Sequence, residues 1–186
     1  MNTALSPQIF SHLFNGALIN KHSYDGAILT NNTLYDEIFS NLDAYRQHYA
    51  LMGYELAMVG DSYFIREQAD GDPFKDVSMK VQVLLEVIAR HITQVPLHAT
   101  VLLDVRSGIS KEILERIGQD DDVKDILRAC EMKASLLQEV TNVLVGRSIA
   151  YWNDREALVL TDGGIALFDQ LFLDEPGTSG QLGSNS

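Results

Sequence analysis

Few side chains in this sequence could carry out chemistry, and their spacing does not favour it. The histidines have no second His or Cys at the separation that a metal site needs; they are His12, His22, His48, His91 and His98. The run Asp120-Asp121-Asp122 could suggest a divalent cation, but a calcium loop alternates its ligands and closes with a glutamate. Capping of a following helix explains these three carboxylates better. We therefore expect no metal ion and no other cofactor.

Two further patterns could belong to an enzyme. Gly60-Asp61-Ser62 has the residue order that opens the nucleophile block of one class of serine esterases. It lies inside a predicted hairpin and no Asp-Xaa-Xaa-His follows it downstream, so a turn is the favoured interpretation. Gly163-Gly164 opens a predicted helix but lacks the Gly-Lys-Ser/Thr or Gly-Xaa-Gly-Xaa-Xaa-Gly context of a phosphate loop. The sequence thus predicts a protein without enzymatic activity.

Composition and charge limit the classes that remain. The chain has 186 residues and 46% hydrophobic side chains, which is typical of one ordinary globular domain or two small ones. Its 14 basic and 26 acidic residues give a formal net charge of −12, which excludes binding of nucleic acid through bulk positive charge. The single cysteine, Cys130, cannot form an internal disulfide and is expected to be a buried, inert thiol. Since no signal peptide or membrane-spanning apolar stretch is recognised, we expect a cytoplasmic protein.

The N-terminal part predicts two helices. Ser6-Pro7 is typical of a helix start, with serine as the N-cap and proline at the first helical position, and predicts a helix over 6–20. A short linker containing Asp25-Gly26 follows. Apolar residues at steps of three and four then predict one long helix over 33–52; they are Leu34, Ile38, Leu42, Tyr45, Tyr49 and Met52.

After this helix the hydrophobic pattern changes to that of strands. Segments 54–59 and 62–66 are rich in aromatic and aliphatic residues and flank the two-residue turn Gly60-Asp61, which predicts a β-hairpin. The polar stretch 67–76 contains glycine and proline and predicts a linker.

The C-terminal part repeats this order of elements. Its predicted helices are 77–92, ended by Pro96, then 110–117, closed by Gly118, and then a segment capped by Asp120 that runs to Leu144 with a break near Met132. Along that last segment the apolar stripe is Ile126, Cys130, Leu137, Val140 and Leu144. A second hairpin, 148–152 with 157–160, turns at Asn153-Asp154-Arg155, and Thr161 begins a final helix. The structure of 96–110, including the apolar run 100–105, remains open.

Both halves are therefore predicted to consist of helices followed by a hairpin, which is the order found in winged-helix domains. We expect an α+β, mainly helical fold of tandem winged-helix domains, each a helical bundle with a β-hairpin wing. The expected divisions are a first domain over 1–70, a linker over 71–76, a second domain over 77–173 and a disordered tail over 174–186. The step Leu160-Thr161-Asp162-Gly163-Gly164 is similar to the exit from the wing in many winged-helix regulators, although a generic strand-to-helix junction would look alike.

The remaining candidates for function are surfaces. Winged helices that read DNA carry basic residues on the helix before the wing and on the wing itself. The DNA-contact candidates at those places are Arg46, Lys133, Arg147 and Arg155. Acidic neighbours surround most of them, so solvated surface is the favoured interpretation of each. Tyr35 and Phe39 lie off the main stripe of their helix at an i, i+4 spacing and could form an exposed patch for a protein partner, or pack against the second unit.

The sequence also resembles a known family. Leu13-Phe14-Asn15-Gly16, a helix ending Tyr45-Arg46-Gln47-His48-Tyr49, and then Gly53-Tyr54-Glu55-Leu56 and Ser62-Tyr63-Phe64-Ile65-Arg66 are similar to the N-terminal half of the MukE-like and MksE-like subunits of bacterial condensins. The resemblance extends more loosely over residues 8–173. The chain is shorter than a typical MukE and lacks its long acidic tail.

The resemblance implies a specific set of partners. Such subunits are tandem winged-helix proteins that form homodimers and bind a kleisin, which bridges the ATPase heads of an SMC protein. The complexes organise and segregate chromosomes or, in some relatives, act against plasmids. We expect a non-catalytic subunit of this kind, nucleoid-associated and without membrane contact, in which DNA contact within the complex stays possible. The alternatives are a winged-helix transcription regulator that binds DNA alone, and a small-molecule sensor or adaptor.

Overall fold

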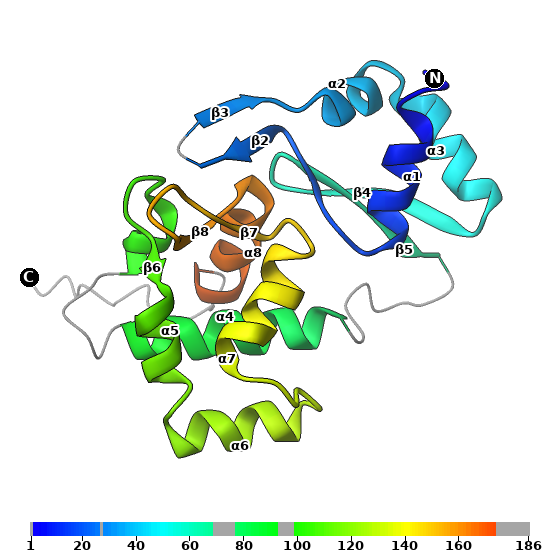
Figure 1. Ribbon diagram of the computed structural model, residues 1–186. Helices are drawn as coiled ribbons and strands as arrows, with labels where there is room; N and C mark the ends of the chain where they lie inside the picture. The colour runs from blue at the N-terminus through cyan, green and yellow to red at the C-terminus, as the bar shows by residue number, and fades with distance from the viewer. Residues whose placement is uncertain (1, 27, 69–76, 93–98, 174–186) are drawn as a thin grey trace, which may run out of the picture.

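The computed structural model describes residues 2–26, 28–68, 77–92 and 99–173 and shows an α+β fold that is mainly helical (Figure 1). The N-terminal elements are α1 (Ser6–Phe14), β1 (Ile19–Asn20), β2 (His22–Asp25), β3 (Ile28–Asn31), α2 (Thr33–Ser40), α3 (Leu42–Leu51), β4 (Tyr54–Val59) and β5 (Ser62–Glu67). The elements that follow are α4 (Val77–Ile92), the short helix η1 (Ala99–Leu103), β6 (Ile109–Ser110), α5 (Lys111–Ile117), α6 (Asp121–Ala129), α7 (Leu136–Glu139), the π-helical turn η2 (Val140–Val145), β7 (Ala150–Trp152), β8 (Ala157–Leu160) and α8 (Asp162–Leu173).

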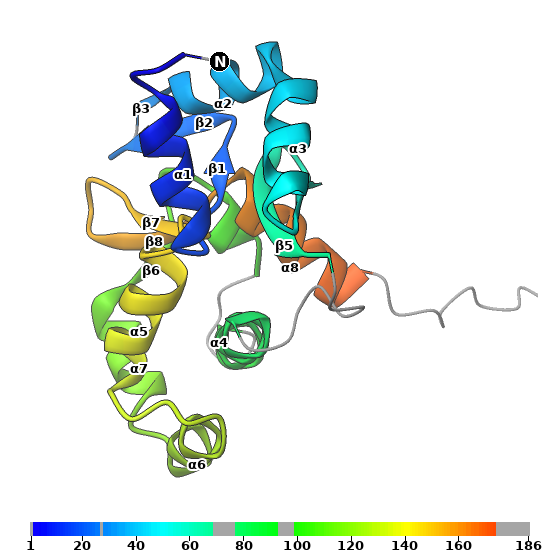
Figure 2. The ribbon, with the colours of Figure 1, turned by 90° about the vertical axis from the view of Figure 1, so that its right-hand side faces the viewer.

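Two three-stranded antiparallel sheets have the same topology. Their strand orders are β1-β5-β4 and β6-β8-β7, so in each the short strand that precedes the helices pairs with the second strand of the hairpin. Each sheet packs on its own cluster of buried apolar residues, one built from elements α1 to β5 and the other mainly from α4 to α8. The chain therefore repeats one arrangement of sheet and helices. Figure 2 shows the N-terminal helices α1 to α3 above strands β6 to β8 and helices α4 to α7.

Helix α1 is shorter than the predicted 6–20. It ends at Phe14, and Gly16 adopts a left-handed φ of 70°, which directs the chain into β1. The expected N-cap is also wrong by one position, because Leu5 occupies it and Ser6 is the first helical residue. The Ser6 hydroxyl instead donates to the carbonyl oxygen of Asn2, at 2.7 Å.

The predicted linker around Asp25-Gly26 is a β-hairpin, which we call the β2–β3 ribbon. Its strands pair from His22 with Asn31 to Asp25 with Ile28. The sequence did not predict the ribbon because β2 is mostly polar and no residue of β3 is buried, so neither strand has the alternating pattern of a strand with one face in the core. A contact distant in sequence holds it instead, since the Tyr24 ring stacks on Tyr151 with a centroid separation of 4.5 Å.

The single helix predicted over 33–52 is two helices. Asn41, with φ of −128°, lies between α2 and α3. The N-cap of α2 is Asn32, whose side chain accepts a hydrogen bond from the Leu34 N–H at 3.0 Å. The apolar spacing continues through the break because both helices pack on the same core.

The other helices and strands agree closely with those predicted from the sequence. The first hairpin is formed by β4 and β5 around Gly60, whose φ is 52°, and the second by β7 and β8. Asp120 caps α6 as expected, and the helical segment is interrupted between α6 and α7, near the predicted position. The buried face of α6 is Val123 and Leu127 rather than Ile126 and Cys130. The linker 71–76, Pro96 and the tail 174–186 lie outside the described residues.

Tyr49 makes the stability of the fold sensitive to alkaline pH. The residue is 1% exposed, and burial raises the pKa of its hydroxyl from 10.0 to about 12. Since the unfolded chain loses this proton near pH 10, the stabilisation is complete below pH 10 and is lost as the pH rises toward 12. Tyr49→Phe removes the titrating hydroxyl, so we expect it to abolish a loss of stability of about 3 kcal/mol. The measurement is a flatter dependence of the melting temperature on pH between 9 and 12. Identical slopes for both proteins would contradict the prediction.

Candidate protein-binding interface

A buried asparagine joins the two halves of the chain. Asn20, on β1, is 4% exposed, and its amide donates to the carbonyl oxygen of Ser148 at 2.8 Å. Its side-chain oxygen accepts from the Ser62 hydroxyl at 2.8 Å and from the Gly163 N–H at 3.0 Å. One side chain therefore connects the first sheet, the segment before β7 and the start of α8. Because each of these groups is buried or nearly so, the network fixes how the two sheets lie against each other.

The β2–β3 ribbon continues this junction to the start of α8. The His22 N–H donates to the Asp162 carboxylate at 3.1 Å, and the His22 ring lies 2.9 Å from the same oxygen. The Asp162 N–H donates to the Tyr24 hydroxyl oxygen at 2.7 Å. Burial, together with a hydrogen bond to Asp162, raises the pKa of Tyr24, so this residue stays neutral and keeps its hydrogen bonds at physiological pH.

Two glycines permit the close approach that this junction needs. A Cβ on Gly164 would lie 1.9 Å from the carbonyl oxygen of Ile149, and one on Gly163 would lie 2.4 Å from a methyl group of Leu18. The Gly164 N–H donates to the hydroxyl of Thr161 at 3.2 Å, so Thr161 caps α8. The physical roles expected for Thr161 and the glycines at this step are thus present.

Of the two aromatic residues proposed for a partner, only one is on the surface. Tyr35 is 7% exposed, and its ring packs 4.9 Å from that of Tyr63 in the N-terminal core. Phe39 is 66% exposed. The exposed patch expected from the pair is therefore absent, because Tyr35 lies on the face of α2 that covers the sheet.

The four basic candidates do not form one site. Arg46 and Lys133 are exposed on separate elements. Arg147 is partly buried, which lowers its pKa, and its guanidinium donates to the Asn15 carbonyl oxygen at 3.4 Å over Gly16. This contact gives Arg147 a structural role at the junction. Arg155 lies at the turn between β7 and β8.

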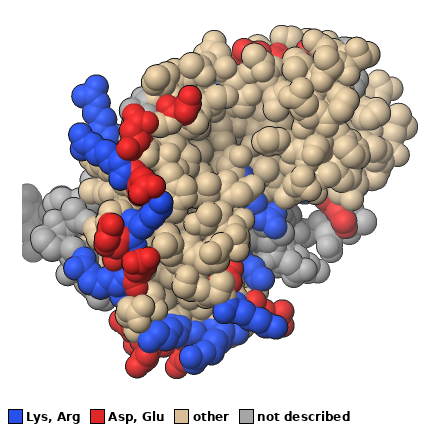
Figure 3. All heavy atoms as spheres, in the orientation of Figure 1, with Lys and Arg blue, Asp and Glu red and all other residues tan. Residues whose placement is uncertain are grey.

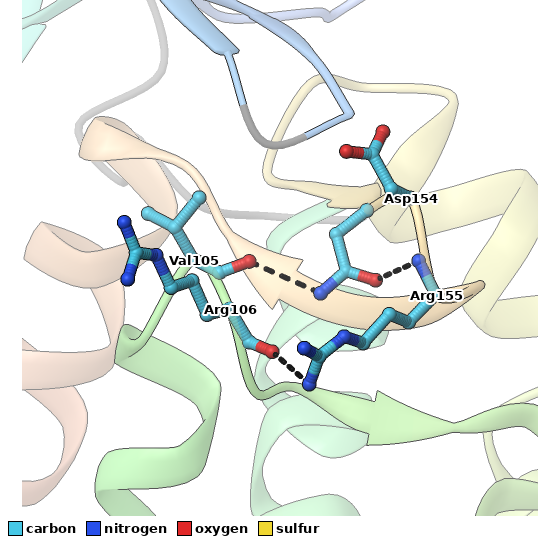
Figure 4. A pocket seen from close by; sticks show the side chains of 5 residues that line it. Val105, Arg106, Asp154 and Arg155 are labelled. Carbon is cyan, nitrogen blue, oxygen red and sulfur yellow. Dashed lines mark hydrogen bonds between the residues drawn. The ribbon is translucent and has the colours of Figure 1, made fainter.

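Arg155 lines a small cavity at this turn, with a volume of 210 Å³ (Figure 4). Its guanidinium donates to the carbonyl oxygen of Arg106 at 3.3 Å. The buried Asn153 donates to the carbonyl oxygens of Val105 and Ser107, each at 3.1 Å, and accepts from the Arg155 N–H at 3.0 Å. These hydrogen bonds hold the turn against the segment before β6.

A surface that the sequence analysis missed lies on α1. Phe10 and Phe14 are 42% and 38% exposed, and their rings stack at 4.1 Å. Phe14 also meets the edge of Tyr54 at 4.9 Å. Helix α1 contains no Asp, Glu, Lys or Arg, and the face shown in Figure 3 is almost free of charge over the N-terminal elements. We call Phe10, Phe14 and Tyr54 the α1 aromatic patch. The sequence could have indicated this patch, because Phe10 and Phe14 lie outside the buried stripe of Ile9 and Leu13 on a helix without Asp, Glu, Lys or Arg.

The described residues were compared with two further kinds of feature, a metal site and a membrane-spanning helix. Among them, no group of three or more His, Cys, Asp or Glu side chains could hold a metal ion. Within the same part of the chain, no helix is long and apolar enough to cross a membrane. The geometry thus consists of a polar junction, an exposed ribbon and an aromatic patch.

Comparison with the models of known protein families gives a match over nearly all of the described chain. The model of the family described as condensin complex protein MksE matches residues 4–171. No curated protein matches the chain.

Proposed function

We propose that this chain, which belongs to the family of condensin complex protein MksE, is a non-catalytic subunit that dimerises and binds a kleisin. The resemblance to this family found in the sequence is confirmed by the match, which covers nearly all of the described chain. Through the kleisin it would join the ATPase heads of an SMC protein in a complex that organises and segregates chromosomes or defends against plasmids. The family match is the observation that carries the proposal.

The repeated topology supports a tandem winged-helix architecture for this subunit. Each sheet places a hairpin beside a short strand and packs it on helices, as a winged-helix domain does, and 1–70 and 77–173 would be the two domains. The junction at Asn20 would hold the domains in one orientation, so that both present their surfaces to the same partner. A kleisin segment could then be clamped between two such chains.

The distribution of charge supports a homodimer through the α1 aromatic patch. Two copies of a chain with a net charge of −12 repel each other, so self-association needs a face without carboxylates. The patch around α1 is such a face, and its exposed aromatic rings are the type of residue enriched in the centre of interfaces.

The acidic charge also agrees with a subunit whose main partners are proteins in the cytoplasm, close to the nucleoid. Any contact with DNA in the assembled complex would use local basic residues such as Arg46, Lys133 and Arg155. Arg147 would contribute less, because its guanidinium is engaged with Asn15.

The direct test is co-purification with the kleisin-like subunit encoded by a neighbouring gene. We expect a complex of defined mass at micromolar concentration, seen by size-exclusion chromatography with light scattering. The chain purified without the kleisin-like subunit is titrated into a fluorescent DNA duplex at low salt, where we expect no binding. If the pair does not associate and the chain binds DNA, with weaker binding after Arg155→Ala, the chain is a DNA-binding regulator and the proposal is wrong.

A further inference from the structure

The β2–β3 ribbon has one occupied edge and one open edge. On β2, the outer edge is covered by the start of α8, where the His22 N–H donates to the Asp162 carboxylate. Among the described residues, β3 pairs with β2 and with no other strand. Figure 1 shows β3 on the outer side of the ribbon, at the surface of the molecule.

The register determines which peptide groups of β3 point outward. The His22 N–H points away from β3 toward Asp162, whereas the Asn32 N–H donates to the Lys21 carbonyl oxygen at 3.0 Å. Cross-strand pairs in an antiparallel ladder alternate between hydrogen-bonded and non-hydrogen-bonded. The partners of Tyr24 and His22, which are Leu29 and Asn31, therefore direct their N–H and C=O groups to the open edge.

The side chains of β3 do not prevent another strand from pairing with this edge. Natural edge strands carry charges, proline or a bulge that prevent pairing with another chain. The sequence of β3 is Ile-Leu-Thr-Asn, without a charge or a proline, and Ile28 and Leu29 are 63% and 44% exposed. An uncharged strand with unpaired peptide groups and exposed aliphatic side chains is suited to accept one more strand.

The turn of the ribbon adds a local negative charge. Asp25 is exposed at the last pair of the ribbon. The Asp154 carboxylate lies directly against Gly26, where a Cβ would be 1.5 Å from its Oδ1. Figure 4 shows Asp154 on the β7–β8 turn, on the side that faces the ribbon. A strand added to β3 would therefore meet two carboxylates at this end and uncharged groups along its length.

We propose that an extended segment of the kleisin adds to β3 as a third strand. This inference rests on the proposed function, because it names the place where the kleisin binds. The segment would alternate apolar side chains, which cover Leu29 and Ile28, and would carry a Lys or Arg next to Asp25 and Asp154. Hydrogen bonds to the peptide groups of Leu29 and Asn31 would supply binding that does not depend on side chains.

The test compares two substitutions at one position, with the full chain and the purified kleisin subunit as the probe. Leu29→Pro removes an outward N–H but leaves the ladder with β2, since proline is tolerated at the outward positions of edge strands. Leu29→Ala removes the side chain and keeps the N–H. By calorimetry we expect Leu29→Pro to weaken kleisin binding at least tenfold and Leu29→Ala at most threefold. Hydrogen exchange should show slower exchange at 28–31 in the complex.

A charge reversal gives a second measurement that does not alter the backbone. Asp25→Lys should weaken binding about threefold to tenfold and reduce its dependence on salt. Equal binding by Leu29→Pro and the unsubstituted chain, with no change of exchange at 28–31, would refute the added strand while leaving kleisin binding intact. Conversion of a dimer to monomers by Leu29→Pro would assign the edge to a second copy of the chain and would also refute it. If the unsubstituted chain does not bind the kleisin, the proposed function itself fails, and this inference with it.

Discussion

Phe10→Glu should convert a dimer of this protein into monomers. The substitution places a carboxylate on the α1 aromatic patch, and a two-fold axis would bring the same charge from both copies to one interface. Like charges brought together in this way cost several kcal/mol, so we expect the dissociation constant of the dimer to rise about 100-fold or more. Light scattering after size-exclusion chromatography at micromolar concentration measures this directly.

A matched control separates dimer loss from unfolding or from added charge. Ile126 is also an exposed apolar residue, at 37%, but it lies on α6, at the other end of the molecule from α1 (Figure 1). Ile126→Glu adds the same charge and should leave the dimer unchanged. If both variants remain dimers, the dimer uses another surface, and if both become monomers, net charge rather than the α1 aromatic patch controls the association.

Asn20→Leu should destabilise the protein more than any surface substitution. Leucine is close to asparagine in size but cannot pair with the Ser148 carbonyl oxygen, the Ser62 hydroxyl or the Gly163 N–H. Each buried polar group left without a partner costs about 1–3 kcal/mol, so we expect a total loss of about 3–5 kcal/mol. That is a large part of the roughly 5–15 kcal/mol that stabilises a typical domain. Urea unfolding followed by circular dichroism measures the loss.

The control for this change is Asn142, an exposed asparagine whose side chain accepts a hydrogen bond from Gln138. Asn142→Leu should change the free energy of unfolding by about 0.5 kcal/mol or less. A loss below about 1 kcal/mol for Asn20→Leu would mean that the junction does not hold the two halves together. We would then expect the halves to unfold in separate transitions even in the unsubstituted chain.

The sequence determined those parts of the fold that depend on neighbouring residues. The turn Gly60-Asp61 and the alternating strands beside it predicted the β4–β5 hairpin, and Asp120 predicted the start of α6. These features form through contacts only a few residues apart, so the residue types suffice. The sequence also resembled the MukE-like and MksE-like subunits, and the match over 4–171 confirms that resemblance.

Tertiary structure alone decided the junction and the surfaces. Asn20 bonds with Ser148 and Gly163, which are 128 and 143 positions away, and nothing near Asn20 in the sequence indicates these partners. The β2–β3 ribbon depends in the same way on Tyr151 and Asp162. Tyr35 is buried because α2 turns it onto β5, whereas Phe10 is exposed because no other described element covers that side of α1. A linear pattern shows that a residue is apolar or polar, but only the folded chain determines which group, if any, lies against it.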